Sequence, residues 1–214
     1  MNKQLSIAGI RQEYSSRELN EDSIDTSPLL QFQFWLEEAL KSKINEPTAM
    51  NLATVDINNR PKSRILLLKE CTNEGFVFYT NYQSQKGNDL AHNPFGAINF
   101  FWPELERQVR IEGKISKVDN HHSDEYFASR PRGSQIGANV SPQSKSILKS
   151  KLEELVQAFS ARNEGKTIDR PENWGGYILK PDYFEFWQGR PSRLHDRITY
   201  TLINGSWVTN RVAP

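Results

Sequence analysis

The fold of this chain is decided by residues 50–80, MNLATVDINNRPKSRILLLKECTNEGFVFYT. Residues 51–56 alternate around Leu52 and Val55, residues 63–69 are apolar enough to be buried on both faces, and residues 76–80 are aromatic and β-branched. Turn-forming residues separate these runs at 58–61 (Asn-Asn-Arg-Pro) and at 73–75 (Asn-Glu-Gly). The stretch therefore predicts three strands joined by turns, as in an antiparallel sheet.

The rest of the chain continues this pattern. Ser27 and Pro28 predict the start of an amphipathic helix with a stripe at Leu29, Phe32, Leu36 and Leu40. Further strands are expected at 97–102, 106–118, 175–180, 182–188 and 193–202, further helices at 84–92, 120–128 and 145–162, and a hairpin tip at Asn204-Gly205 before a last strand. Helices that are grouped between strands, and do not alternate with them, favour a mainly β fold: an antiparallel barrel or sandwich with peripheral helices.

Composition limits the function classes. The 214 residues favour one domain, expected over residues 26–214 behind a polar, flexible arm over residues 1–25. With 27 basic and 26 acidic residues, nothing indicates a nucleic-acid partner. Cys71 is the single cysteine, which excludes an internal disulfide and fits a reducing compartment. Since no apolar run approaches about 20 residues and no signal-peptide core is present, we expect a cytoplasmic protein without a membrane partner.

Residues 184–197, FEFWQGRPSRLHDR, combine aromatic side chains, a turn and regularly spaced cations. If the part after the turn is extended, Arg193, His195 and Arg197 lie on one face, where they suit a planar anionic ligand next to a group in acid/base chemistry. The alternative is a solvated strand edge with a salt bridge through Asp196.

This block resembles the signature of the pyridoxamine 5'-phosphate oxidase family, in which Glu-Phe/Tyr-Trp is followed by Arg-Leu-His-Asp-Arg. Other stretches resemble the family in the expected order over nearly the whole chain, including the Arg-x-Glu-Tyr at 11–14 and the Ser-Arg-Pro-x-x-Ser-Gln-Ile-Gly-Ala at 129–138. The resemblance implies an FMN-binding split β-barrel and a homodimer with FMN at the subunit interface. It also implies oxidation of pyridoxine or pyridoxamine 5'-phosphate to pyridoxal 5'-phosphate, with O2 as electron acceptor and release of H2O2, and of NH3 from the amine.

Several stretches could bind phosphate on chemical grounds alone. Arg64 and Lys69 flank an apolar strand with opposite parity, which suggests two separate anion contacts, although charged strand ends are also common without a ligand. Tyr79-Thr80 and the helix start Ser84-Gln85-Lys86 offer hydroxyls, an ammonium group and free N–H groups, and a plain helix cap is the alternative. Relatives usually have Arg or Lys where this chain has Gln85, a departure that could weaken binding of the FMN phosphate.

Residues 126–144 form a long polar segment, expected as a loop that a ligand orders or as a flexible surface loop. Tyr126, Arg130 and Ser134 could converge on one phosphate, and Gln143 with Ser144 on another. The amide of Gln108 suits the edge of a flavin ring, and by itself it indicates only a polar strand. Asn139 and Gly133 depart from residues frequent in relatives, at positions without an assigned role.

Matched residue by residue, the resemblance implies the following roles. The catalytic residues are Arg193 and His195. The substrate contacts are Arg11, Gln12, Glu13, Tyr14, Lys69, Tyr126, Arg130, Ser134, Arg193, Leu194 and His195. The FMN contacts are Arg64, Ile65, Leu66, Leu67, Leu68, Lys69, Tyr79, Thr80, Gln85, Lys86, Gln108, Gln143, Ser144, Trp187 and Arg197.

Three alternatives stay open. The chain could be another flavin split-barrel enzyme such as a nicotinamide-dependent reductase, although such an enzyme should lack the Arg-Leu-His-Asp-Arg block. It could be a non-catalytic protein that binds FMN or pyridoxal phosphate, or an interaction module. A metal site is not expected, because the adjacent His121 and His122 point apart on a helix.

Overall fold

The computed structural model describes residue 9, residues 13–14 and residues 17–214. Their helices are α1 (Pro28–Lys41), α2 (Gln85–His92), α3 (Asn120–Ser129), α4 (Arg132–Val140) and α5 (Lys149–Arg162), with short 3-10 turns η1 (Pro103–Leu105) and η2 (Pro191–Arg193). Their strands are β1 (Ala49–Val55), β2 (Pro61–Leu67), β3 (Glu70–Thr72), β4 (Gly75–Asn81), β5 (Phe95–Trp102), β6 (Arg107–Lys117), β7 (Trp174–Gln188), β8 (Asp196–Ile203) and β9 (Ser206–Arg211). The predicted mainly β composition with grouped helices is confirmed.

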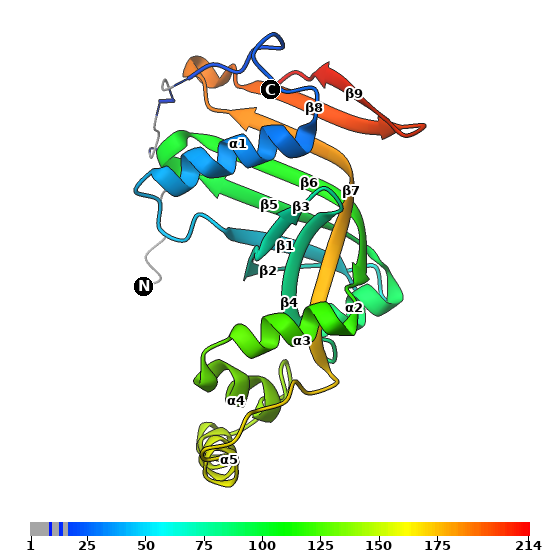
Figure 1. Ribbon diagram of the computed structural model, residues 1–214. Coiled ribbons are helices and arrows are strands. Elements are labelled where there is room, and N and C mark those ends of the chain that lie inside the picture. The colour runs from blue at the N-terminus through cyan, green and yellow to red at the C-terminus, as the bar shows by residue number, and fades with distance from the viewer. Residues whose placement is uncertain (1–8, 10–12, 15–16) are drawn as a thin grey trace, which may run out of the picture. The chain divides into compact units, whose positions relative to one another are not determined.

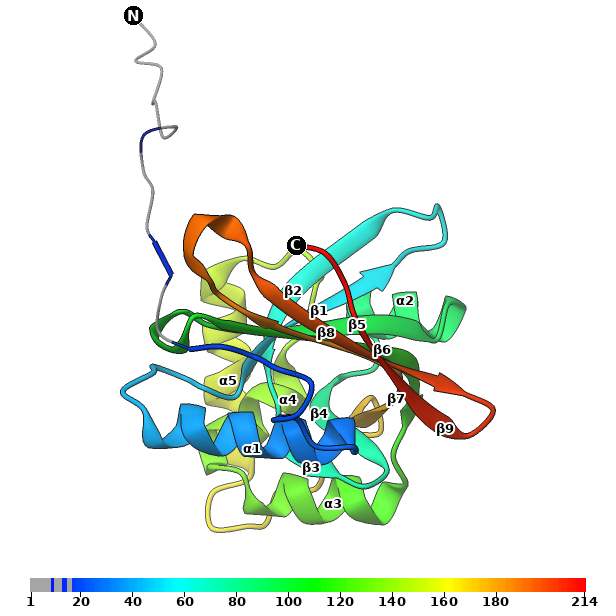
Figure 2. The same ribbon diagram turned by 90° about the horizontal axis from the view of Figure 1, so that it is seen from above.

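The strands form one sheet in the order β2-β1-β5-β6-β7-β4-β3, and the hairpin of β8 and β9 is attached through β7 (Figure 1). The pairings of β1 with β2 and β5, of β4 with β3 and β7, and of β8 with β7 and β9 are antiparallel. Figure 2 shows β8 and β9 side by side up to their turn, where Asn204 and Gly205 have positive φ as the sequence predicts.

The chain divides into two compact units that interleave along the sequence. Unit 1 consists of Met1–Pro47, Phe100–Arg110 and Tyr183–Pro214, and unit 2 consists of Thr48–Asn99 and Ile111–Asp182. The strands β5, β6 and β7 therefore have residues in both. The expected division into an arm over residues 1–25 and one domain over residues 26–214 stays a prediction.

In unit 1 the helix α1 packs its aromatic stripe against the sheet. Ser27 caps it by accepting a hydrogen bond from the Leu30 N–H, and Pro28 stands at its first position. Phe32 and Trp35 are fully buried, with ring centroids 5.0 Å from Phe100 and 5.2 Å from Phe186. Burial of each such side chain is worth about 1.5–3 kcal/mol, so the stripe fixes α1 on the sheet.

In unit 2 the helices α3, α4 and α5 pack together around buried side chains (Figure 1). The cluster joins Phe127 of α3 and Ile136 of α4 to Ile168 and Trp174, and Val156 and Phe159 of α5 cover it. Because Trp174 begins β7, the cluster anchors the helices to the sheet.

Four expectations from the sequence were wrong. Residues 63–69 are not buried on both faces: Ile65 is 66% exposed, because β2 ends the sheet order and pairs only with β1. Residues 175–180 and 182–188 belong to one strand, β7, which continues through Pro181 although proline usually ends a ladder. The segment 126–144 is not simply a loop, since it holds the end of α3 and all of α4. The strand expected from residue 193 begins at Asp196.

Candidate functional site

A buried lysine stands where β4 meets α2 in unit 2. Lys86 is 6% exposed, and its Nζ donates to Thr80 Oγ1 and to Ser84 Oγ, both at 3.1 Å. Ser84 is also the N-cap of α2. Burial, reinforced by the nearby cation of Arg64, lowers the pKa of Lys86 to about 8. The residues therefore hold a desolvated cation next to a helix N-terminus, an environment that favours an anion.

Arg64 brings a second cation to the same place. Its Nη1 donates to the carbonyl oxygen of Leu52 at 3.2 Å and to Thr54 Oγ1 at 2.7 Å, and its Nη2 lies 3.6 Å from Asp89 Oδ2. The Thr54 hydroxyl donates in turn to Asp89 Oδ2 at 2.7 Å. Burial lowers the pKa of Arg64, and Asp89 opposes that shift. This network fixes the guanidinium group on one side of the buried lysine.

The segment after α4 completes this group. Thr80 Oγ1 donates to Gln143 Oε1 at 3.4 Å, and the Gln85 N–H donates to Ser144 Oγ at 3.2 Å. The structure thus brings together predicted FMN contacts that lie up to 80 positions apart in the sequence. We call this set the α2 cluster: Arg64, Thr80, Gln85, Lys86, Gln143 and Ser144.

Next to Thr80 and Gln143, unit 2 contains a cavity of about 520 Å³, which we call the basic pocket. Arg130 is the most informative residue in its wall. Its guanidinium lies 4.4 Å from the ring centroid of Trp174, yet its Nη1 is buried without a hydrogen-bond partner in the described part of the chain. Burial lowers the pKa of Arg130. Among the residues predicted for the site, the pocket is lined by Leu66, Leu67, Lys69, Tyr79, Thr80, Tyr126, Arg130, Ser134 and Gln143.

Stacked aromatic rings form one side of the basic pocket. Tyr79 stacks on Tyr126 with centroids 3.7 Å apart, and it lies 5.7 Å from the ring of Trp174. The Tyr79 hydroxyl donates to Glu70 Oε1 at 3.0 Å, and His122 Nε2 lies 2.8 Å from the same oxygen. Burial and the Glu70 charge raise the pKa of Tyr79. Tyr79 therefore acts as a neutral donor that holds the Tyr126 ring in position.

The other predicted site residues that the structure brings together lie in unit 1. The His195 ring is 4.6 Å from Trp187 and 5.8 Å from Tyr14, which is 5.7 Å from Trp187. Gly189 is required here, because a Cβ at this position would stand 2.7 Å from Tyr14 Cγ. Burial and the Arg193 cation lower the pKa of His195, and Asp196 opposes them.

The extended chain that would place Arg193, His195 and Arg197 on one strand face is wrong at its start. Arg193 belongs to η2 with a φ of 61°, and the chain becomes a strand only at Asp196. Arg197 donates from Nε and Nη2 to the two carboxylate oxygens of the buried Glu185, both at 3.0 Å. A turn therefore replaces the first part of the expected strand, while Arg197 on β8 stands opposite Trp187, whose ring centroid lies 4.6 Å from that of His195.

The remaining predicted residues have simpler surroundings. Gln108 is half-buried on β6, Ile65 is exposed on β2, Leu68 is buried after β2 and Leu194 is 70% exposed. The Glu13 carboxylate accepts a hydrogen bond from the Ser192 N–H at 3.3 Å. Arg11 and Gln12 lie outside the described residues.

Sequence reasoning missed Trp174, Thr54 and Asp89. Trp174 follows a polar segment, and the sequence around it shows no alternation of apolar and polar residues. Only the fold places it beside Arg130. Thr54 could have been found, since it shares the inward parity of Leu52 on β1. Asp89 could have been found as well, because it follows Lys86 by one helical turn.

Comparison with known proteins now decides the family. The family model described as pyridoxamine 5'-phosphate oxidase matches residues 36–158, more than half of the chain. This chain belongs to that family. A second model, the pyridoxine 5'-phosphate oxidase C-terminal dimerisation region, matches residues 174–214 and supports a homodimer.

Close relatives extend the match over the whole length. The pyridoxine/pyridoxamine 5'-phosphate oxidase of Actinobacillus succinogenes is 54% identical, over 98% of this chain and 100% of that protein. The protein of the same name from Cytophaga hutchinsonii is 56% identical, over 98% and 99%.

Solved structures agree on the fold. PhzG from Burkholderia lata 383, in complex with tetrahydrophenazine-1-carboxylic acid, has a TM-score of 0.88 at 25% identity and covers 95% of this chain and 100% of its own. A pyridoxamine 5'-phosphate oxidase-related, FMN binding protein from Nostoc punctiforme has a TM-score of 0.72 at 18% identity, over 89% and 100%. The predicted antiparallel FMN-binding split barrel is confirmed. Among helices in the described part of the chain, none has the length and apolar character needed to cross a membrane.

Proposed function

We propose that this protein is an FMN-dependent pyridoxine/pyridoxamine 5'-phosphate oxidase. It converts pyridoxine 5'-phosphate and O2 to pyridoxal 5'-phosphate and H2O2. With pyridoxamine 5'-phosphate one water is consumed and NH3 is released in addition. The family match and the relatives at 54% and 56% identity support this activity. Because the product is pyridoxal 5'-phosphate, the reaction serves the synthesis and salvage of that compound.

One observation carries the substrate assignment, namely the buried Nη1 of Arg130 without a partner in the described residues. A buried donor without an acceptor is costly, so this geometry favours an anionic ligand in the basic pocket. Lys69, Tyr126 and Ser134 line the same pocket and supply an ammonium group and two hydroxyls. These four side chains bind the substrate phosphate and place binding energy far from the reacting carbon, where it orients the substrate.

The α2 cluster fits the phosphate of FMN. It contains two desolvated cations, a helix N-terminus and the amide and hydroxyl of Gln143 and Ser144. FMN held there would supply the two-electron redox chemistry that couples oxidation of the C4' carbon to reduction of O2. Gln85 contributes its backbone N–H to this cluster, and Lys86 supplies the charge.

The other assigned residues surround the reacting rings. Arg193 and His195 contact the pyridine ring, with Leu194, Glu13 and Tyr14 beside them, and Arg11 and Gln12 are expected to join them. Residues 65–68, Gln108, Trp187 and Arg197 would contact FMN at the interface of the homodimer. A cytoplasmic location and the lack of a metal stay predictions.

The test is an assay on purified protein with FMN in air, supplied with pyridoxine 5'-phosphate. We expect pyridoxal 5'-phosphate and peroxide to form in equal amounts. A flavin that is reduced only by a nicotinamide cofactor would instead identify a reductase. A protein that binds FMN and reacts with neither would be a binding protein.

A further inference from the structure

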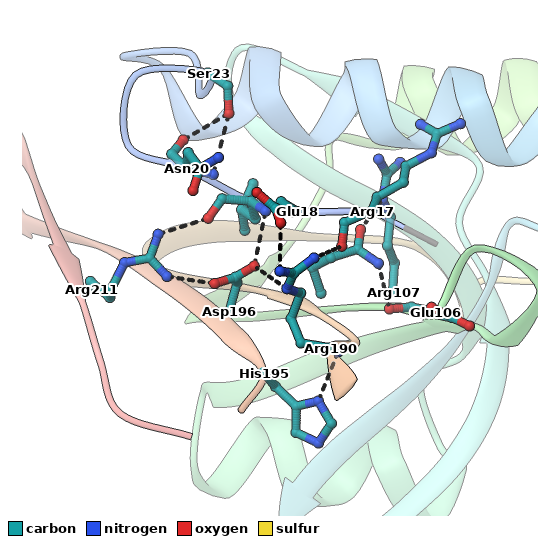
Figure 3. Close-up of polar contacts among 12 residues, drawn as sticks. Arg17, Glu18, Asn20, Ser23, Glu106, Arg107, Arg190, His195, Asp196 and Arg211 are labelled. Carbon is teal, nitrogen blue, oxygen red and sulfur yellow. Dashed lines mark hydrogen bonds and ion pairs between the residues drawn. The ribbon is translucent and has the colours of Figure 1, made fainter. Parts of the chain in front are cut away.

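The carboxylate of Asp196 joins three segments of unit 1. Its Oδ1 accepts a hydrogen bond from Arg211 Nη1 at 2.8 Å, and its Oδ2 accepts one from the Leu19 N–H at 3.1 Å. Arg190 Nε lies 3.4 Å from the same Oδ2, so Figure 3 shows Asp196 between the two guanidinium groups. The side chain is only 17% exposed. Asp196 thus fixes residue 19, residue 190 and β9 to the start of β8.

Both arginines also hold the segment 17–21. Arg190 donates to Glu18 Oε1 at 2.5 Å and to the Arg17 carbonyl oxygen at 3.3 Å. Arg211 donates to Glu21 Oε1 at 2.6 Å and to the Leu19 carbonyl oxygen at 2.7 Å. Since Glu18 and Glu21 are 58% and 55% exposed, their ion pairs are screened, and the shielded Asp196 is the centre of the network. We call this network the Asp196 junction.

The junction reaches His195 through the backbone of Arg190. The Arg190 N–H donates to His195 Nδ1 at 3.1 Å (Figure 3). A backbone N–H can only donate, so Nδ1 must present its lone pair, and the neutral ring then carries its proton on Nε2. Arg190 donates this hydrogen bond, and Asp196 follows His195 in the chain. The ion pair between Arg190 and Asp196 therefore ties the two ends of the contact together.

The turn between these two residues needs such an anchor. Ser192 and Arg193 have φ values of 56° and 61°, which are unfavourable for residues with a side chain. The Gly189 N–H donates to the Glu106 carbonyl oxygen at 2.7 Å and holds the start of the turn. Without a tie across its two ends, the turn could relax and move the imidazole.

We propose that Asp196 is a positioning residue for His195: through Arg190 it holds the ring with Nδ1 occupied and with the Nε2–H free to donate to the substrate. The proposal rests on the proposed function and narrows it. It makes His195 a hydrogen-bond donor that stabilises charge on the substrate, and it excludes His195 as the base that removes a proton.

The charges around the ring agree with this role. Arg193 lies two residues before it and Asp196 follows it directly, Tyr14 packs against it, and Glu13 accepts a hydrogen bond from the Ser192 N–H on the turn. Burial and Arg193 lower the pKa of His195 against the opposing effect of Asp196. A proton on Nδ1 would also face the Arg190 N–H, which acts in the same direction. Both effects favour the neutral imidazole over the imidazolium.

The experiment compares Asp196→Asn with Asp22→Asn, which makes the same charge change at an exposed position. The FMN-loaded protein is labelled with 15N-histidine, and His195 is assigned among the four histidines by its loss in His195→Gln. In a fixed tautomer the protonated Nε2 and the unprotonated Nδ1 of His195 have widely separated 15N chemical shifts. This separation should shrink in Asp196→Asn, where the tautomer is no longer fixed, and persist in Asp22→Asn. Turnover of pyridoxine 5'-phosphate should fall about tenfold in kcat, as expected for loss of one oriented hydrogen bond, with KM within about twofold.

Three outcomes would overturn the proposal: unchanged His195 shifts in Asp196→Asn, equal changes in both variants, or changed shifts with full kcat. If Asp196→Asn does not fold, Arg190→Met tests the same link, since it keeps the backbone N–H and removes only its anchor. The shifts need no turnover, so a wild-type protein without oxidase activity would refute the proposed function and leave the tautomer test intact.

Discussion

Replacement of Arg130 by Met should affect substrate binding and stability in different ways. A hydrogen bond to a charged group contributes about 1.5–3 kcal/mol, so loss of the guanidinium should raise KM for pyridoxine 5'-phosphate by about 10- to 100-fold. The unfolding free energy has two opposing contributions. Removal of the buried Nη1, which has no partner in the described residues, should raise the unfolding free energy by about 1–3 kcal/mol. Loss of the contact with Trp174 at 4.4 Å should lower it by about 0.5–2 kcal/mol.

The expected net change in the unfolding free energy of the variant therefore lies between a loss of about 1 kcal/mol and a gain of about 2.5 kcal/mol. Steady-state peroxide formation gives KM, and urea unfolding of the FMN-free protein gives the stability. Arg132→Met is the matched control, because Arg132 donates to the carbonyl oxygens of Lys166 and Asn163 and should leave KM unchanged. A variant that loses more than about 2 kcal/mol and keeps its KM would refute the assignment of Arg130 to the phosphate.

Three further predictions concern charge and packing. The pKa of Lys86 is about 8 in the folded protein and higher in the unfolded chain, so the unfolded state binds more protons above pH 8 and the FMN-free protein should gain stability from pH 8 to about 10.5. Lys86→Met should remove that rise and weaken FMN binding. A flat pH profile of the wild-type protein in urea unfolding would contradict this prediction. The hydrogen bond to Glu70 raises the pKa of His122, so the stabilisation from this pair is full below about pH 6.5 and is lost as pH rises through the raised pKa. Because both side chains are more than one-third exposed, His122→Gln should change the unfolding free energy by less than about 1 kcal/mol at pH 6 and hardly at all at pH 9. An equal loss at both pH values would disprove the pairing. Gly189→Ala should push the Tyr14 ring aside, lowering kcat/KM on the order of tenfold while FMN binding persists; unchanged kinetics would show that the Tyr14 contact is unimportant.

The strand pattern could be predicted because local rules decide it. Alternation around Leu52, the turn at Asn204-Gly205 and the cap at Ser27 are each set by a few neighbouring residues, and the structure has all three. The errors arose where tertiary context prevails. The exposure of Ile65 depends on β2 lying at the end of the sheet order, which its own residues do not encode.

The site divides in the same way. Residue types and the family resemblance pointed to the basic pocket and to the α2 cluster before any distance was known. They could not find Trp174, which reaches Arg130 only through the path of β7. They also misplaced Arg193, because an extended reading of residues 193–197 ignores the positive φ values that the turn requires.

The interleaving of the two units sets an order for synthesis on the ribosome. Unit 2 has all its residues once position 182 has emerged, whereas unit 1 needs segments from 1–47, 100–110 and 183–214. Arg211 pairs with Glu21 across 190 positions, so this contact can close only after residue 211 has emerged. Such distant pairing is slow to form, and Trp35 of α1 lacks its partner ring on β7 until Phe186 has emerged. The nascent chain is therefore most prone to aggregation before residues 183–214 appear, and chaperones that shield aromatic side chains should raise its yield most at that stage.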